Sequence, residues 1–248
     1  MRSYCVTDVG QRRKENQDAV YASEQSIGNL PNLFVVADGM GGHNAGEFAS
    51  RCSISVLTDS VKKDMSFNPI KIIRHGIETA NEQVYLEASL DPSKTGMGTT
   101  MVVVTIVGYY AYIANVGDSR LYLMNQDGIV QITKDHSLTA EMVRMGRLTK
   151  EEAINHPNKN IITRAVGIGD FVTIDFFDVE LDENTKILLC SDGLTNMVSD
   201  EMIYQIVYSS KNIEEAGDKL VECANDNGGV DNISVVIVEP FTNEVKEC

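Results

Sequence analysis

The residues best suited to chemistry are four aspartates in apolar, strand-like surroundings. One of them follows the apolar run 33–37 and precedes the glycine-rich segment 39–42. A single Asp-Gly pair is common in turns, but carboxylates gathered at neighbouring strand ends repel one another unless a cation lies between them. The sequence therefore predicts a metal site. The four aspartates are Asp38, Asp118, Asp192 and Asp231.

The ligands of this predicted site are oxygen atoms, which favours magnesium or manganese over zinc. No Cys-x-x-Cys or His-Glu-x-x-His motif supports a zinc site. A nucleotide loop is also excluded, because Asp38 would repel a pyrophosphate and Gly-Lys-Ser/Thr is absent.

The apolar pattern predicts strands that follow one another as hairpins, with helices grouped apart, which is typical of α+β layers and not of a Rossmann alternation. Capping boxes mark the start of two short helices, at Thr149 with Glu152 and at Asn212 with Glu215. Longer helices are predicted at 45–62 and 69–88. Strands are predicted at 2–8, 18–23, 33–37, 99–107, 109–116, 119–124, 171–179, 186–191 and 232–238, and the helix after Asn212 at 213–226.

Composition indicates one enzyme domain of 248 residues with 43% hydrophobic content. The formal net charge of −15 argues against nucleic-acid binding. The N-terminus lacks the apolar core of a signal peptide, and the most apolar stretch, 101–116, is too short for a membrane helix. Five scattered cysteines are typical of reduced thiols. We therefore expect a cytoplasmic protein with no membrane or nucleic-acid partner.

A second polar cluster, 8–18, lies between two predicted strands and contains Arg12, Arg13 and Lys14. On its own this cluster is typical of a solvated turn, and the sequence does not distinguish its three cations from ordinary surface charge.

Taken in order, the motifs resemble those of the metal-dependent type 2C protein serine/threonine phosphatases, the PPM family, and most closely its bacterial members. The resemblance spans nearly the whole chain, and six ordered motifs carry it together. They are Asp8-x-Gly10-x-x-Arg13-x-x-Asn16-Gln17-Asp18, Val36-Ala37-Asp38-Gly39-Met40-Gly41-Gly42-His43, Gly98-Thr99-Thr100, Val116-Gly117-Asp118-Ser119-Arg120, Ser191-Asp192-Gly193-Leu194 and Asp231-Asn232.

The resemblance implies a four-layer α/β/β/α sandwich, two antiparallel sheets flanked by helices, over residues 1–248, with a flap at about 135–170. It implies two manganese or magnesium ions bridged by Asp38, with room for a third. The Gly39 carbonyl would bind one ion, Asp192 and Asp231 the other, Asp18 a metal-bound water, and Asp118 with Asp192 the third ion, while Arg13 would grip the substrate phosphate.

Two positions of this family pattern raise questions. His43 is the candidate general acid for the leaving serine or threonine oxygen, and the alternative is that it caps the following helix. Gln17 replaces the glutamate of many relatives, so affinity at one ion is expected to be lower. For His136, as for His75 and His156, a surface or structural role is expected.

We therefore expect hydrolysis of phosphoserine and phosphothreonine in proteins, opposing a serine/threonine protein kinase, by a monomer. Two alternatives stay open at this point. A non-catalytic relative should have lost metal aspartates, and an unrelated metallohydrolase should bring histidines into the metal shell.

Overall fold

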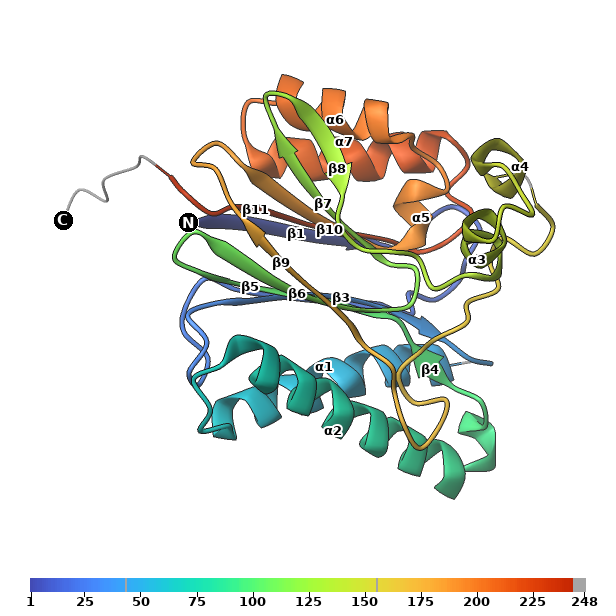
Figure 1. The fold of residues 1–248 in the computed structure, drawn as a ribbon. Helices are drawn as coiled ribbons and strands as arrows, with labels where there is room; N and C mark the ends of the chain where they lie inside the picture. The colour runs from blue at the N-terminus through green and yellow to red at the C-terminus, as the bar shows by residue number, and fades with distance from the viewer. Residues whose placement is uncertain (43, 155, 243–248) are drawn as a thin grey trace.

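In the computed structural model, which describes residues 1–42, 44–154 and 156–242, the chain forms two antiparallel sheets packed face to face (Figure 1). The first sheet has the order β1-β11-β10-β7-β8. Its strands are β1 (Arg2–Asp8), β11 (Ile233–Glu239), β10 (Lys186–Cys190), β7 (Arg120–Asn125) and β8 (Gly128–Gln131).

The second sheet has the order β2-β3-β5-β6-β9, and the short β4 pairs with β3 beside this path. Its strands are β2 (Asp18–Ser23), β3 (Leu33–Met40), β4 (Gly98–Thr99), β5 (Met101–Val107), β6 (Tyr110–Val116) and β9 (Asp175–Glu180). Consecutive strands pair as hairpins, as the sequence predicts.

Helices cover the outer face of each sheet, so the four-layer α/β/β/α sandwich is confirmed (Figure 1). The second sheet is covered by α1 (Ala45–Lys63) and α2 (Pro69–Leu90), followed by the 3-10 turn η1 (Pro92–Lys94). The first sheet is covered by α5 (Asp192–Thr195), α6 (Asp200–Ser209) and α7 (Ile213–Asp226). None of the helices in the described part of the chain is long and apolar enough to cross a bilayer.

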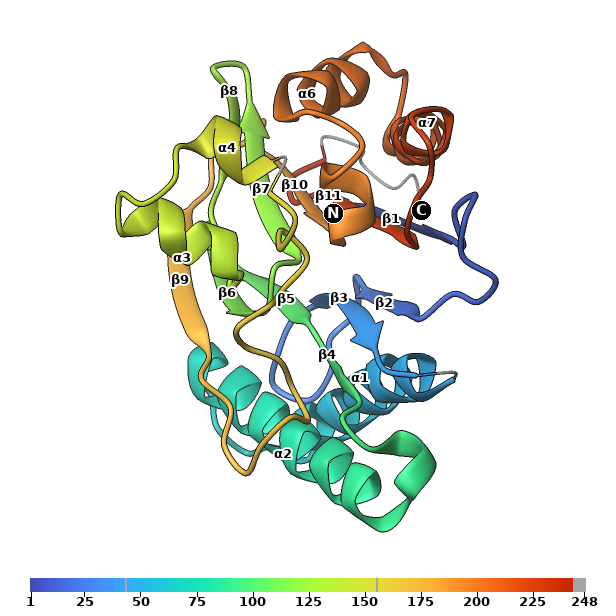
Figure 2. The ribbon, with the colours of Figure 1, turned by 90° about the vertical axis from the view of Figure 1, so that its right-hand side faces the viewer.

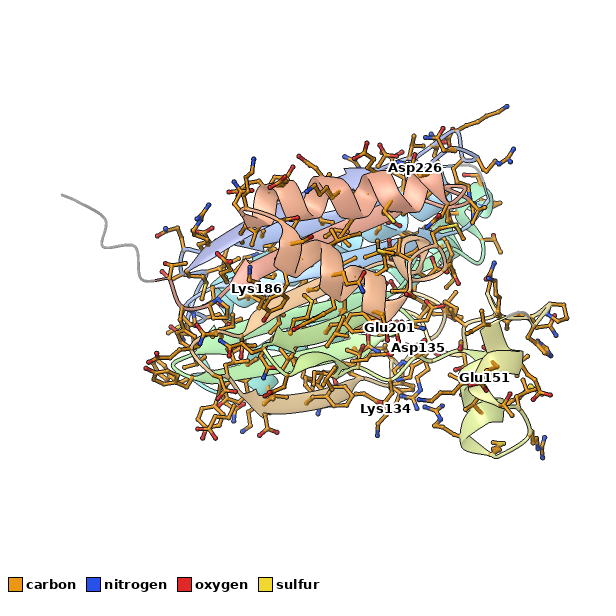
Figure 3. All side chains as sticks on the ribbon, turned by 90° about the horizontal axis from the view of Figure 1, so that it is seen from above. Lys134, Asp135, Glu151, Lys186, Glu201 and Asp226 are labelled. Atoms are coloured by element: carbon orange, nitrogen blue, oxygen red, sulfur yellow. The ribbon has the colours of Figure 1, made fainter. Side chains whose placement is uncertain are left out.

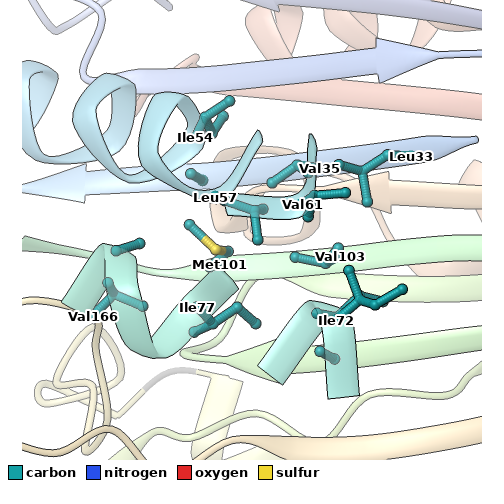
Figure 4. Packing of buried hydrophobic residues seen from close by; sticks show 14 of the residues in the cluster. Leu33, Val35, Ile54, Leu57, Val61, Ile72, Ile77, Met101, Val103 and Val166 are labelled. Atoms are coloured by element: carbon teal, nitrogen blue, oxygen red, sulfur yellow. The ribbon is translucent and has the colours of Figure 1, made fainter. Parts of the chain in front are cut away.

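Strand alternation divides the core into separate apolar layers. In β3, Leu33, Val35 and Ala37 pack against α1 and α2, whereas Phe34 and Val36 face the other sheet. Figure 4 shows the helix-side layer, where Leu33 and Val35 of β3 lie near side chains of α1, α2 and β5. The next residue on the inter-sheet face after Val36 is Asp38, which the alternation therefore places at the end of the gap between the sheets.

Several sequence-based predictions of the elements were wrong in detail. β3 does not end before Asp38 but continues through Met40, because Asp18 and β4 provide partners. The predicted strand 99–107 is interrupted at Thr100, whose N–H donates to the carbonyl of Asp38. The predicted strand 171–179 begins only at Asp175, because the pairing between β6 and β9 ends at the pair of Asn115 with Asp175. The elements β4, β8, α3, α5 and α6 were not predicted.

The segment between β8 and β9 lies at one end of the sandwich and contains α3 (Leu138–Arg144) and α4 (Lys150–Ile154). The predicted capping box at the start of α4 is confirmed: Glu152 N–H donates to Thr149 Oγ1, and Thr149 N–H donates to the Glu152 carboxylate. Figure 3 shows Glu151 on a helix that projects from the body, and Asp135 at the base of this projection.

Candidate active site

Aspartates from both sheets meet at the end of the sandwich that carries α3 and α4. Asp18 begins β2 and lies opposite Asp38 of β3 in the antiparallel register. Asp192 follows β10, and Asp231 precedes β11. The structure therefore gathers side chains that are up to 213 residues apart in the sequence, as the numbering of Asp18 and Asp231 shows.

Burial and repulsion by neighbouring carboxylates raise the pKa values of four aspartates at this end of the sandwich, Asp18, Asp38, Asp118 and Asp192. The pKa of Asp38 lies well above its usual range because the group is buried and faces Asp18, Asp192, Asp118 and Asp231. Burial raises the pKa of Asp18 to about 7, and burial together with Asp192 raises that of Asp118 to about 8. Burial and Asp231 also raise the pKa of Asp192. All five aspartates therefore belong to one electrostatic cluster.

Two carboxylate oxygens of this cluster are buried and accept no hydrogen bond, namely Oδ1 of Asp18 and Oδ1 of Asp192. Buried acceptors without a donor are costly, and a divalent cation satisfies them. The donors are oxygen atoms throughout, which suits magnesium or manganese. Among the described residues, no three acidic, histidine or cysteine side chains form a ready-made cation cage. The fit to a metal therefore rests on the two buried oxygens and the gathered charge.

Gly39 lies where β3 meets the start of α1. A β-carbon on Gly46 would lie 2.8 Å from the carbonyl oxygen of Gly39, and a β-carbon on Gly39 would overlap the backbone of Gly46. Both positions therefore require glycine, because any side chain would separate the strand from the helix. The same β-carbon on Gly46 would lie 2.8 Å from Oε1 of Gln17, so the Gln17 side chain packs against the first turn of α1.

Arg13 lies at the edge of the cluster, in the loop between β1 and β2. Its Nη2 donates to Oδ2 of Asp231 at 2.8 Å, and about half of the side chain, 51%, is exposed. The structure therefore separates Arg13 from Arg12 and Lys14, which the sequence alone does not. His43 lies outside the described residues.

Asn232 joins the cluster to the loop between β1 and β2 that carries Arg13, here called the Arg13 loop. The sequence singles out Asn232 only as part of a motif. Its side-chain oxygen accepts from Gln17 N–H at 2.8 Å, and its amide donates to the carbonyls of Val9 and Glu15, both at 2.9 Å. Because Asn232 is buried, the loop is held by side-chain bonds that exclude solvent.

Buried hydroxyls orient two of the aspartates, and the sequence singles out Ser191 and Thr100 only as members of motifs, without these contacts. Ser191 donates from Oγ to Oδ2 of Asp18 at 2.7 Å and accepts from Ser234 N–H. Thr100 Oγ1 accepts from Asp38 N–H at 2.9 Å and is 2.7 Å from Oγ of Ser119. Such contacts join distant segments, so no local pattern could have predicted them.

A partly buried cation, Arg120, lies two residues beyond Asp118. Arg120 binds Asp135 in a two-pronged pair, with Nη2 2.8 Å from Oδ2, and Nη1 donates to the Tyr122 hydroxyl. Tyr122 in turn donates to Asp200 at the start of α6. This network fixes the base of the α3–α4 segment to the first sheet.

His136 has a structural position, as expected. It is 1% exposed, and its Nδ1 accepts from Gly117 N–H while Nε2 is 3.1 Å from Oδ2 of Asp175. Burial lowers the pKa of His136, which favours the neutral ring. His75 and His156 also have local partners: His75 pairs with Asp64, and His156 Nδ1 accepts from Asn158 N–H.

Comparison with known proteins finds relatives of this sequence and of this fold. The family model "Protein phosphatase 2C" matches residues 3–233. The serine/threonine phosphatase Stp of Listeria welshimeri is 41% identical over 237 residues, which cover 94% of this chain and 93% of that protein. The crystal structure of the serine/threonine phosphatase Stp1 from Staphylococcus aureus superposes with a TM-score of 0.88 at 37% identity, over 95% of this chain and 93% of that one.

A further solved structure is the catalytic domain of the serine/threonine protein phosphatase PstP in complex with two manganese ions, with a TM-score of 0.84 at 33% identity over 95% of this chain and 96% of that one. The chain belongs to the protein phosphatase 2C family, and it is a protein serine/threonine phosphatase. This membership sets aside the unrelated metallohydrolase, and the retained aspartates argue against a non-catalytic relative.

Proposed function

We propose that this protein hydrolyses phosphoserine and phosphothreonine monoesters in proteins with the help of two manganese or magnesium ions. The observation that carries the proposal is the gathering of buried carboxylates that raise one another's pKa, with one oxygen each of Asp18 and Asp192 left without a hydrogen bond. Such a cluster is stable only when protonated or when a cation neutralises it. The two manganese ions in the related PstP catalytic domain support neutralisation by cations.

The residues that would hold the ions follow the family pattern. Asp38 would bridge the two ions, with the Gly39 carbonyl, Asp192 and Asp231 as further ligands. Asp18 would act through a water, and Asp118 with Asp192 would support a third ion. Divalent ions held by these residues would lower the pKa of a bound water and neutralise charge on the phosphoryl oxygens.

Arg13 would bind the phosphate of the substrate. Its guanidinium carries five N–H donors, and the bond from Nη2 to Asp231 orients the group at the edge of the cluster. The half-exposed position leaves room for phosphoryl oxygens on the outer side. A planar guanidinium holds two such oxygens in a geometry that a lysine ammonium does not reproduce.

His43 would protonate the leaving serine or threonine oxygen, with capping of α1 as the alternative. A general acid matters when the leaving group is poor, so His43→Ala should slow phosphopeptide hydrolysis on the order of 10²-fold and affect para-nitrophenyl phosphate much less. Equal losses on both substrates would assign a structural role to His43.

We further propose that residues 1–248 form one catalytic domain with a flap at about 135–170, that the protein is a cytoplasmic monomer, and that it opposes a cognate serine/threonine kinase. The flap assignment is supported by the position of α3 and α4, which project from one end of the sandwich (Figure 2).

The test is manganese-dependent hydrolysis of a phosphothreonine peptide, with and without a chelator. We expect chelation to abolish turnover, and Asp192→Asn to do the same at any manganese concentration. Asp226→Asn is the matched control, because Asp226 is exposed on α7 (Figure 3). Turnover that survives both chelation and Asp192→Asn would refute the proposed function.

A further inference from the structure

An apolar surface begins directly beside the aspartate cluster. Met40 is two residues beyond Asp38 on β3, so its side chain lies on the same strand face, about 7 Å further along. Its Cε would lie 2.8 Å from a β-carbon on Gly98, and Cδ1 of Ile168 would lie 2.9 Å from the same point. The side chains of Met40 and Ile168 therefore both lie against Gly98 and close to each other.

The loop that carries Ile168 is fixed to the cluster by hydrogen bonds. Val166 forms a two-way backbone bridge with Thr99, and the Thr99 hydroxyl donates to the carbonyl of Asp38 at 2.9 Å. Ile168 is two residues beyond Val166. Its position relative to Asp38 is therefore set by the backbone.

The same loop is also fixed to α2. Asn81, which is 1% exposed, accepts from Gly167 N–H at 2.7 Å and donates to the Gly169 carbonyl at 2.8 Å. The loop passes in front of β4 and continues beside α2, on the end of the molecule that faces the viewer in Figure 2. A loop held in this way presents its apolar side chains without an ordering cost on binding.

Two apolar side chains of this loop face solvent: Ile168 is 51% exposed, and Phe171, three residues further along, is 93% exposed. We propose that Met40, Ile168 and Phe171, here called the apolar track, bind the substrate polypeptide that flanks the phosphorylated residue, and prefer an apolar side chain two or three positions away from it. The proposal rests on the proposed function, because the phosphate must lie at the aspartate cluster for the flanking chain to reach the track.

The apolar track begins next to the aspartate cluster, and this identifies the substrate polypeptide as its occupant. An extended polypeptide rises about 3.3 Å per residue, so a chain anchored by its phosphate near Asp38 reaches Met40 after about two residues. An apolar side chain placed there covers surface that is otherwise in contact with water.

The experiment compares two phosphothreonine peptides that differ only at the second and third positions on each side, which are leucine in one and serine in the other. The variant is Ile168→Ser with Phe171→Ser. We expect it to raise KM for the leucine peptide on the order of tenfold. Turnover number, KM for the serine peptide and kinetics on para-nitrophenyl phosphate should change less than twofold.

Phe67→Ser is the matched control, because Phe67 is 87% exposed on the connection between α1 and α2, at the opposite end of α1 from the cluster. The proposal is refuted if the double variant changes KM for the leucine peptide no more than Phe67→Ser does. It is also refuted if the double variant reduces hydrolysis of para-nitrophenyl phosphate as much as hydrolysis of the leucine peptide.

Sedimentation of wild type and double variant tests the other occupant, a second copy of this chain. A dimer that dissociates in the double variant would assign the surface to self-association and overturn the proposal. A wild type that hydrolyses no phosphopeptide would overturn the proposed function itself, whereas a wild type that hydrolyses both peptides with equal KM would overturn the track alone.

Discussion

Asn232 offers a direct test of how the Arg13 loop is held. Its side chain makes three bonds to backbone groups of residues 9–17, to Gln17 N–H and to the carbonyls of Val9 and Glu15. Only 4% of Asn232 is exposed, so water does not replace these bonds when the side chain is removed. At about 1 kcal/mol for each bond, we expect Asn232→Ala to lower the free energy of unfolding by about 3 kcal/mol.

The same substitution should also reduce activity. The loop carries Arg13, and the ion-pair partner of Arg13 is Asp231, which precedes Asn232 in the sequence. A misplacement of about 1 Å in a substrate-binding group costs on the order of 10²-fold, which is the loss in kcat/KM expected for a phosphothreonine peptide. Asn232→Asp keeps the acceptor for Gln17 but loses both donors and adds a negative charge to the cluster. Its losses should be at least as large.

Urea unfolding and steady-state kinetics measure both effects. Asn227→Ala is the control, since this exposed side chain makes one backbone bond, to the carbonyl of Met197 at 2.9 Å, and should cost under about 1 kcal/mol. If Asn232→Ala is no less stable than Asn227→Ala, the loop is held by other contacts and the reasoning fails.

Three further predictions concern the charges of the site. Asp38→Asn should abolish turnover yet raise the melting temperature of chelator-treated protein by a few degrees. Burial and the neighbouring aspartates raise the pKa of Asp38, so folding without metal must protonate this carboxyl group, whereas asparagine is neutral in both states; a lower melting temperature without metal would contradict this. The raised pKa values of Asp18, about 7, and Asp118, about 8, mean that the folded chain binds more protons than the unfolded chain, whose aspartates titrate near 3.8. The free energy of unfolding of chelator-treated protein should therefore fall as pH rises from about 4 to about 8, and equal stability in urea at pH 5 and pH 8 would exclude this. Arg13→Ala should raise KM for a phosphothreonine peptide while manganese affinity measured by calorimetry hardly changes, whereas Arg12→Ala should do neither; similar losses in both variants would indicate a diffuse basic surface.

Much of the site could be predicted because strand periodicity fixes the direction of each side chain. The alternation that buries Phe34 and Val36 between the sheets also places Asp38 there, and the register with β2 brings Asp18 opposite. An aspartate at the end of an apolar strand can therefore be assigned to one face of the sheet from the sequence alone. Whether each aspartate binds a metal stays a prediction.

Other features were missed for different reasons. The start of α6 carries a readable signal, because Ser199 caps it by accepting from Met202 N–H and acidic residues follow. The strand predicted from Phe171 was wrong because pairing with a partner strand, and not β propensity, decides where β9 begins. The roles of Asn232 and Ser191 depend on contacts across the whole chain, which local sequence patterns do not encode.

The charge of the molecule makes a local arrangement of cations necessary. A formal net charge of −15 repels a phosphorylated residue, which itself carries about −1.5 to −2. Screening restricts this repulsion to about 8 Å at physiological ionic strength, so the field at the entrance depends on nearby groups. Arg13, which is half-exposed in the loop between β1 and β2 and bonded to Asp231, opposes the repulsion at the cluster. Its attraction weakens with salt, whereas apolar contacts with the track do not. With the proposed track, capture of the phosphate and choice of the flanking sequence would depend on separate forces, which would let the enzyme discriminate among phosphoproteins whose phosphates are chemically identical.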